Sequence, residues 1–360
     1  MTKISCYSDE SLTQPGDETF FRFTSLGKQK AVEEVRPIQV DFELTTRCAG
    51  SCRFCFAGSM PGKYITMPTE KVKGLLDEFV DLGIRAIHWL GGDPLMHPDI
   101  YDIIAYAGKI GLRSNLFTAG IISKEAARKL ARLIQENHLH LVGIHIDTLR
   151  QEIHDIVNRN PKLLSIKIQS YYNLIEAGIP NPKIRPCMTY TKPVAASVEE
   201  TFDWFIDEMG ARHILINIFK PYGFGRDNSQ WEPSLSEVQR ACAYRAKKLS
   251  SNWLRVGPTD FGQCFCRTLL FVSADGRLAP CPLLQDLAVG NVYQEKVRTL
   301  FERHRDYLLF NFPIKGKCGN CENNNVCFGC RGNAFFYGGD LQGPDPKCWL
   351  NPDAKESYCY

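Results

Sequence analysis

The 360-residue sequence has little net charge and no long apolar run. Its formal net charge is +3 at pH 7, so the charge balance does not favour a nucleic acid or an anionic membrane surface as a partner. No apolar run approaches the roughly 20 residues of a membrane-spanning helix, and the polar, acidic N-terminus lacks the basic start and apolar core of a signal peptide. We therefore expect a cytoplasmic protein with no nucleic acid and no membrane among its partners.

Cysteine, by contrast, is abundant, with 15 residues. A reducing cytosol disfavours structural disulfides, so ligation of metal by thiolates explains this number better. Eight of the 15 cysteines lie between Cys264 and Cys348, among Gly, Pro and Asn and with little periodicity. Because such a segment has few apolar side chains to bury, we expect a small domain that is held together by metal.

The preceding part of the chain alternates short β-branched or aromatic runs with segments of helical periodicity. This pattern is typical of repeated βα units on a parallel sheet, and six units favour an open barrel. We predict an α/β fold, a partial (β/α)6 TIM-like barrel with a small cysteine-rich C-terminal domain. The expected parts are an N-terminal extension (1–35), the barrel (36–226), a helical bridge (227–256) and the cysteine-rich domain (257–360). Strands are predicted over 38–44, 84–90, 112–117, 141–146, 184–190 and 214–219, and helices over 69–82, 99–109, 124–136, 162–177 and 198–209.

Three cysteines lie within eight residues directly after the first predicted strand. Cys48, Cys52 and Cys55 are separated by small or polar residues and by the aromatic Phe54. An iron–sulfur cluster is normally held by four cysteines, so three thiolates would leave one iron open to an external ligand. An incomplete zinc site, or cysteines that are merely buried, are the alternatives, although zinc usually finds a nearby fourth ligand.

This CX3CXΦC spacing, with Phe54 as the aromatic Φ, resembles the radical S-adenosylmethionine (SAM) superfamily. The resemblance implies a [4Fe-4S] cluster on Cys48, Cys52 and Cys55, with the open iron chelated by the amino and carboxylate groups of SAM. It also implies reductive cleavage of SAM to a 5′-deoxyadenosyl radical, which abstracts a hydrogen atom from a substrate.

Further segments resemble the SAM contacts of that superfamily. Gly91, Gly92 and Asp93 look like its GGE motif, and the segment with Thr118 is similar to the one near the SAM ribose. His145 would occupy a polar position facing SAM, and Arg159 could pair with the SAM carboxylate, a task suited to guanidinium. An ordinary turn, a structural histidine and a solvated charge at a helix end are the alternatives. The implied cofactor-binding residues are Phe54, Gly91, Gly92, Asp93, Thr118, His145 and Arg159.

The order of the tail cysteines resembles the SPASM domain, which carries two auxiliary [4Fe-4S] clusters. Two fully ligated clusters need eight thiolates, and eight cysteines are present. A zinc ribbon, or one cluster with spare thiols, is the alternative, because paired CX2C units are also a zinc signature. By analogy, the nearer cluster would use Cys264, Cys266, Cys281 and Cys330, and the distal one Cys318, Cys321, Cys327 and Cys348.

Cys187 lies on the fifth predicted strand and could return a hydrogen atom to a substrate radical, although a small buried hydrophobic residue is the simpler interpretation. SPASM relatives often act on peptides, so we expect a peptide maturase that introduces a crosslink, a thioether, an epimerisation or another change. A separate peptide-recognition protein and an electron donor such as flavodoxin or ferredoxin are expected partners. The alternatives are a small-molecule radical SAM dehydrogenase that acts on a sugar or similar alcohol, and a non-catalytic iron–sulfur or zinc-binding protein.

Overall fold

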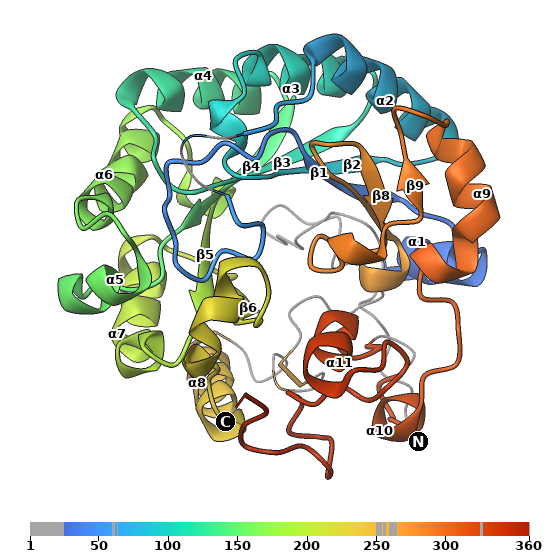
Figure 1. Cartoon of the computed structure of the whole chain (residues 1–360). Coiled ribbons are helices and arrows are strands. Elements are labelled where there is room, and N and C mark those ends of the chain that lie inside the picture. The colour runs from blue at the N-terminus through green and yellow to red at the C-terminus, as the bar shows by residue number, and fades with distance from the viewer. Residues whose placement is uncertain are drawn as a thin grey trace.

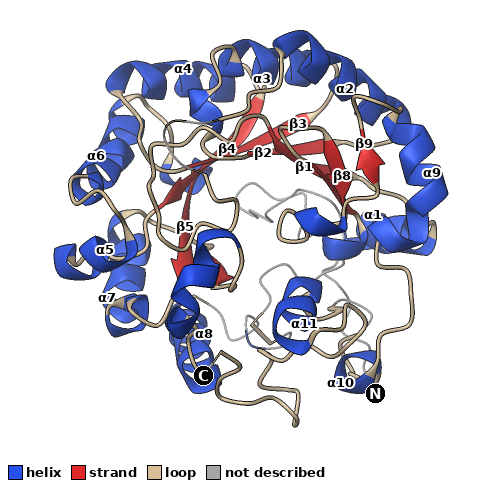
Figure 2. Ribbon diagram, viewed as in Figure 1, coloured by secondary structure: helices blue, strands red, loops and turns tan. Residues whose placement is uncertain are grey.

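The computed structural model describes residues 25–59, 62, 64–249, 254, 257–258, 265–324 and 327–359. A curved sheet forms its centre, and helices cover the outer face (Figures 1 and 2). Most of the predicted N-terminal extension lies outside the described residues, which begin with helix α1 (Ser25–Glu33). None of the helices in the described ranges is long and apolar enough to cross a bilayer.

Six parallel strands make up the predicted barrel sheet. Neighbours in sequence pair in space, in the order β6-β5-β4-β3-β2-β1. Parallel pairing between consecutive strands requires a crossover, and helices supply it here. The strands are β1 (Gln39–Glu43), β2 (Ala86–Leu90), β3 (Arg113–Thr118), β4 (Leu139–His145), β5 (Ile184–Tyr190) and β6 (Leu215–Ile218). The α/β class and the partial TIM-like barrel are therefore confirmed.

The crossover helices agree with most of the sequence expectations. Four of the five predicted helices are present, and the fifth, predicted over 198–209, is α7 (Val198–Asp203) followed by a π-helical turn (Trp204–Glu208). A short helix that was not predicted, α5 (Gln151–Val157), precedes α6, and α8 (Leu235–Lys248) lies in the predicted helical bridge. The other crossover helices are α2 (Thr69–Leu82), α3 (Ile100–Lys109), α4 (Lys124–Gln135) and α6 (Leu163–Glu176).

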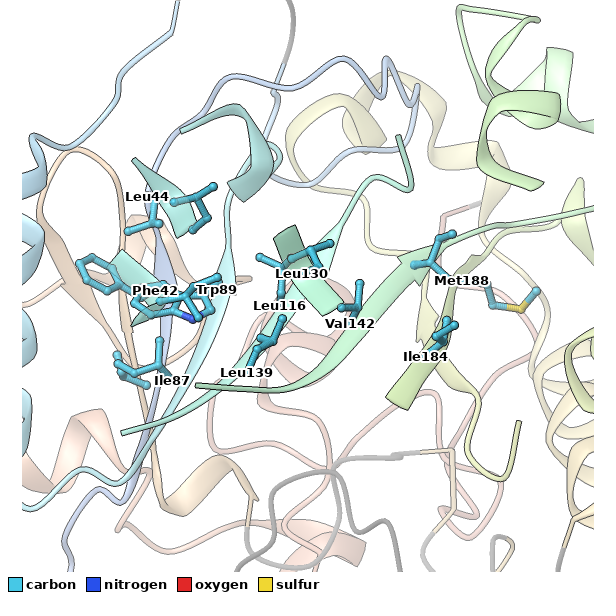
Figure 3. Packing of buried hydrophobic residues seen from close by; sticks show 14 of the residues in the cluster. Phe42, Leu44, Ile87, Trp89, Leu116, Leu130, Leu139, Val142, Ile184 and Met188 are labelled. Carbon is cyan, nitrogen blue, oxygen red and sulfur yellow. The ribbon is translucent and has the colours of Figure 1, made fainter. Parts of the chain in front are cut away.

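The main hydrophobic core lies between the strands and these helices. Side chains alternate along a strand, so Val40 and Phe42 on β1 point toward the helices and into this core. Figure 3 shows Phe42 beside Trp89 of β2, with Leu130 of α4 near the strand side chains. Alternation sends the polar residues Asp41 and Glu43 to the opposite, inner face of the sheet, where both are buried. The inner face of β1 is therefore polar and acidic.

The sheet and the core continue past the domain boundary expected at residue 257. Strand β7 (Leu269–Val272) pairs in parallel with β1, and β8 (Arg277–Ala279) and β9 (Gly290–Asn291) extend this edge antiparallel. Helix α9 (Val297–Leu308) contributes to the same core as the barrel. The expectation that the tail has few apolar side chains to bury is therefore wrong for 269–309, since β7 and α9 both contribute buried side chains to this core.

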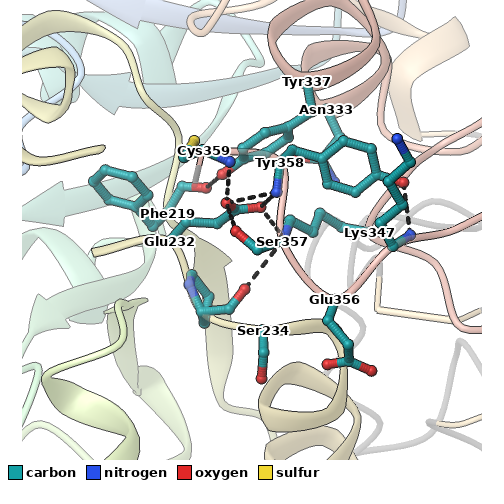
Figure 4. Close-up of polar contacts among 12 residues, drawn as sticks. Phe219, Glu232, Ser234, Asn333, Tyr337, Lys347, Glu356, Ser357, Tyr358 and Cys359 are labelled. Atoms are coloured by element: carbon teal, nitrogen blue, oxygen red, sulfur yellow. Dashed lines mark hydrogen bonds and ion pairs between the residues drawn. The ribbon is translucent and has the colours of Figure 1, made fainter. Parts of the chain in front are cut away.

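The end of the chain is fastened to the barrel by a buried ion pair. Lys347 and Glu232 are both 0% exposed, and the Glu232 carboxylate also accepts hydrogen bonds from the Ser357 hydroxyl and the amides of Tyr358 and Cys359 (Figure 4). Two short helices precede this contact, α10 (Gly316–Gly319) and α11 (Arg331–Gly338). The contact places the last residues beside α8 (Figure 1).

Candidate active site

The loop after β1 brings Cys48 and Cys52 to the two sides of a glycine. The amide of Gly50 donates to Cys48 Sγ at 3.2 Å, and the Cys52 thiol lies 3.7 Å from the Gly50 carbonyl oxygen. A Cβ added at Gly50 would lie 3.1 Å from Cys48 Sγ and 3.8 Å from Cys52 Sγ. Such a Cβ would also lie 3.3 Å from Ala119 Cβ, so the two thiols and Ala119 converge closely on Gly50.

Backbone amides surround the third thiol of this loop. The backbone amides of Ser59, Ala57 and Gly58 lie near Cys55 Sγ and act to lower the pKa of this thiol. Burial nevertheless raises the pKa of Cys55, and it raises the pKa of Cys48 to about 12. Buried thiols of this kind remain protonated until a metal displaces the proton. The loop thus combines three thiols, which are the usual ligands of iron, with backbone amides near the sulfur atoms. It therefore fits an iron–sulfur cluster.

Two glycines after β2 let their backbone touch the cysteine loop. The amide of Gly92 donates to the Thr45 carbonyl at 2.7 Å, and the amide of Asp93 donates to the Arg47 carbonyl at 2.8 Å. A Cβ at Gly91 would lie 2.4 Å from the Thr45 oxygen, and one at Gly92 would lie 2.3 Å from the Arg47 oxygen. No larger residue fits without moving the cysteine loop, so both glycines position that loop.

The carboxylate of Asp93 is held by the end of β3. It accepts hydrogen bonds from the Thr118 hydroxyl at 2.8 Å and from the amides of Ala119 and Leu95. Burial raises the pKa of Asp93 to about 6, although these three donors oppose the rise. Asp93 and Thr118, both predicted SAM contacts, are therefore bonded to each other and join the β2 and β3 loops.

His145 lies against the cysteine loop at the end of β4. Its ring makes an edge contact with Phe54, with centroids 6.0 Å apart, and its Nε2 lies 3.2 Å from Asp147 and 3.3 Å from the Thr189 hydroxyl. Burial lowers the pKa of His145 to about 4 even though Asp147 opposes this. The imidazole is therefore neutral at pH 7, and the structure brings two predicted cofactor residues together.

Arg159 contacts the cysteine loop from its outer side. Its guanidinium donates to the carbonyl oxygens of Ser51 and Cys52 at 3.5 and 3.2 Å, and it stacks on the Phe224 ring at 4.7 Å. The neighbouring Asn158 is buried and donates from Nδ2 to the Gly50 carbonyl at 2.5 Å and to Cys52 Sγ at 3.6 Å. Sequence reasoning missed Asn158, although its place directly before Arg159 could have drawn attention to it.

Three of the four cysteines predicted for the nearer auxiliary cluster lie close together. Burial raises the pKa of Cys266 to about 12, and the neighbouring Cys330 adds to the rise; the pKa of Cys281 is raised by burial and then by Cys266. Cys264 lies outside the described residues. Cys187 on β5 packs against Leu215, Leu269, Phe117 and Cys266, so its side chain lies on the inner face of the sheet.

The four cysteines predicted for the distal auxiliary cluster line one small pocket. The empty volume of this pocket is about 320 Å³, and Gly329 and Asp345 contribute to its wall. The amide of Asp345 donates to Cys318 Sγ at 3.2 Å. A Cβ at Gly329 would lie 2.8 Å from the same sulfur, so the backbone approaches it closely. The pocket cysteines are Cys318, Cys321, Cys327 and Cys348.

Comparisons with known proteins agree with this arrangement. Over about 88% of both sequences, the chain is 27% identical to the AdoMet-dependent heme synthase of Oleidesulfovibrio alaskensis. It is also 27% identical to the PqqA peptide cyclase of Gluconobacter oxydans, over 88% of this chain and 91% of the cyclase. Its fold resembles that of Streptococcus suis SuiB bound to the precursor peptide SuiA, with a TM-score of 0.66 at 17% identity over 90% of this chain and 79% of SuiB.

A family description matches the part of the chain that carries the cysteine loop and the contacts around it. Residues 42–205 match the radical SAM superfamily. This range begins within β1 and ends just beyond α7, so it includes the loop with Cys48, Cys52 and Cys55 and the strand ends that brace it. Residues 42–205 therefore resemble a radical SAM domain, and members of that superfamily use a [4Fe-4S] cluster and SAM.

Proposed function

We propose that Cys48, Cys52 and Cys55 hold the [4Fe-4S] cluster that binds SAM. The observation that carries this proposal is the convergence of Cys48 Sγ and Cys52 Sγ on Gly50, where a Cβ would lie 3.1 and 3.8 Å from the two sulfurs. When bound, cluster and SAM supply a 5′-deoxyadenosyl radical that takes a hydrogen atom from the substrate. The protein holds the loop in place through Gly92 and Asn158, while the neutral His145 offers a hydrogen-bonding group without adding charge.

We also propose two auxiliary [4Fe-4S] clusters, on the nearer and the distal cysteine sets. The pocket lined by all four distal cysteines supports the second of these. Each thiolate of a cube binds a different iron, and the eight cysteines of the tail match the eight ligands that two cubes need. Such clusters can accept the electron that is released when a substrate radical is oxidised.

The leading substrate is a ribosomally made peptide. The support comes from the relatives, since one is named a PqqA peptide cyclase and a protein of similar fold was solved with a precursor peptide. A separate peptide-recognition protein would present the peptide to the barrel mouth. In the cytoplasm, a reduced flavodoxin or ferredoxin would supply the electron for SAM cleavage.

Where the reaction ends with return of a hydrogen atom, Cys187 is the proposed donor. Burial raises the pKa of Cys187 to about 12, so the sulfur keeps its hydrogen at neutral pH. Transfer breaks the S–H bond, forms a C–H bond and leaves a thiyl radical. An electron from the external reductant and a proton from water then restore the thiol.

A small molecule is the second candidate substrate. The match to a heme synthase over 88% of each chain favours it and points to a heme precursor. The inner face of β1 and β2 carries polar groups, among them the buried carboxylate of Asp41, which is hydrogen-bonded to His88 at 2.7 Å. The sugar or similar alcohol expected from the sequence stays a prediction.

The deciding experiment uses anaerobically reconstituted protein, SAM and a strong reductant. We expect release of 5′-deoxyadenosine and a metal content of about 12 iron atoms per chain. Intact clusters without release of 5′-deoxyadenosine would refute the proposal that the protein is a radical SAM enzyme. Stoichiometric zinc would refute the proposal of auxiliary clusters. Mass spectrometry then separates the substrates. A mass change in a co-expressed peptide encoded beside this gene supports a maturase, whereas a change only in an added iron porphyrin supports the second candidate.

A further inference from the structure

Lys167 is a buried cation that the roles described above do not use. It lies on α6, and its side chain is 1% exposed. Its ammonium nitrogen makes no hydrogen bond to any part of the chain that the structure describes. A buried ammonium without a counter-charge is costly, so this arrangement calls for an anion that arrives from outside the chain.

The stem of Lys167 passes beneath the loop that follows β3. A Cβ added at Gly120, where φ is +86°, would lie 3.3 Å from Lys167 Cγ. Burial raises the pKa of Cys48, Cys52 and Asp93, and in all three the Lys167 ammonium opposes the rise. The positive charge therefore lies within electrostatic reach of the cysteine loop and of the acid behind it.

The buried carboxylates nearest to this charge have other partners. Asp93 accepts from Thr118 and two amides, and Asp147 accepts from the Thr189 amide and contacts His145. The negative charge that faces Lys167 then comes from what binds at the cysteine loop, either the cluster with its thiolates or SAM.

We propose that Lys167 binds the carboxylate of SAM. This inference rests on the proposed function, because it requires SAM at the open iron beside Cys48 and Cys52. Arg159, the cation that the sequence suggests for this task, is exposed, and its guanidinium is bonded to the Ser51 and Cys52 carbonyls. Arg159 then positions the loop, while Lys167 recognises the ligand.

The test compares Lys167→Met with wild type in binding three ligands to the reconstituted protein by calorimetry. SAM and S-adenosylhomocysteine carry the carboxylate, and decarboxylated SAM does not. Since a hydrogen bond to a charged group is lost, affinity for the first two should fall about 10- to 100-fold, and affinity for decarboxylated SAM should stay the same. An equal fall for all three ligands, or no fall for SAM, would overturn the proposal.

Two further measurements keep the result interpretable. Methionine fits the buried stem and removes an uncompensated charge, so the Tm of Lys167→Met without SAM should equal or exceed that of wild type; a lower Tm would mean a structural lysine and also count against the proposal. The matched control, Arg159→Gln, should weaken all three ligands alike. If wild type itself neither binds nor cleaves SAM, the proposed function fails, whereas wild-type cleavage with an unchanged Lys167→Met affinity rejects this inference alone.

Discussion

The buried pair of Glu232 and Lys347 should tolerate loss of its cation better than loss of its anion. In Glu232→Gln, the Lys347 ammonium loses its counter-charge and keeps uncharged partners, namely the new amide oxygen, the Pro233 carbonyl at 3.2 Å and the faces of Tyr337 and Tyr358. In Lys347→Met, the Glu232 carboxylate keeps three donors, from Ser357, Tyr358 and Cys359. The two single variants therefore leave very different buried charges behind.

The expected magnitudes follow from this difference. Stranding a buried cation costs about 3–5 kcal/mol, whereas losing one charge-assisted hydrogen bond from a carboxylate that keeps others costs about 1.5–3 kcal/mol. For a chain of 360 residues, an unfolding entropy of about 2.1 cal/mol/K per residue converts these costs to Tm losses of about 4–7 °C and about 2–4 °C. The double variant strands no charge, so its loss should not exceed that of Glu232→Gln.

The assay is anaerobic differential scanning calorimetry of the holoprotein, with hydrogen exchange at the Tyr358 and Cys359 amides. Both amides donate to Glu232, so they should exchange faster in Glu232→Gln than in Lys347→Met. Equal Tm losses in the two single variants, or a double variant whose loss is the sum of both, would refute the reasoning.

Three further outcomes are expected. Gly92→Ala places a Cβ 2.3 Å from the Arg47 carbonyl and should remove about four of about 12 iron atoms, while Gly74→Ala, with no atom within 4 Å of its Cβ, should keep them all; equal iron counts would contradict the close contact. Asn158→Ala loses a hydrogen bond to Cys52 Sγ, so the midpoint potential of the cluster proposed on Cys48, Cys52 and Cys55 should fall by roughly tens of millivolts. Redox titration followed by electron paramagnetic resonance measures this potential. An unchanged potential would show that the bond does not tune the cluster. Burial raises the pKa of Glu43 from 4.5 to about 7, so the native state holds the extra proton and stability falls by about 3 kcal/mol as pH rises through this window. Glu43→Gln should therefore raise the Tm at pH 8 much more than at pH 5, and a pH-independent effect would count against the raised pKa.

The fold was largely predictable because its signals are local. Each strand of the barrel is a short run of buried residues, and its crossover helix carries an apolar stripe. The hydrophobic periodicity of the sequence therefore predicts the βα alternation. The site was predictable to the extent that its residues are neighbours in sequence. Cys48, Cys52 and Cys55 lie on one loop, and a loop after a strand of a parallel sheet occupies the edge where ligands bind.

Only the tertiary structure decided which distant residues meet. In the sequence, nothing distinguishes Lys167 from the other charged residues of its helix. Its burial without a hydrogen-bond partner depends on the loop after β3 that covers it. Glu232 and Lys347 are likewise ordinary surface residues in sequence, but the returning C-terminus buries both. Strand β7 was hidden because four residues are too few to show a period, and its pairing with β1 is long-range. The sequence by itself thus determined the elements and the loop that carries the three cysteines, whereas burial and charge pairing depend on contacts between distant segments, which only the folded chain defines.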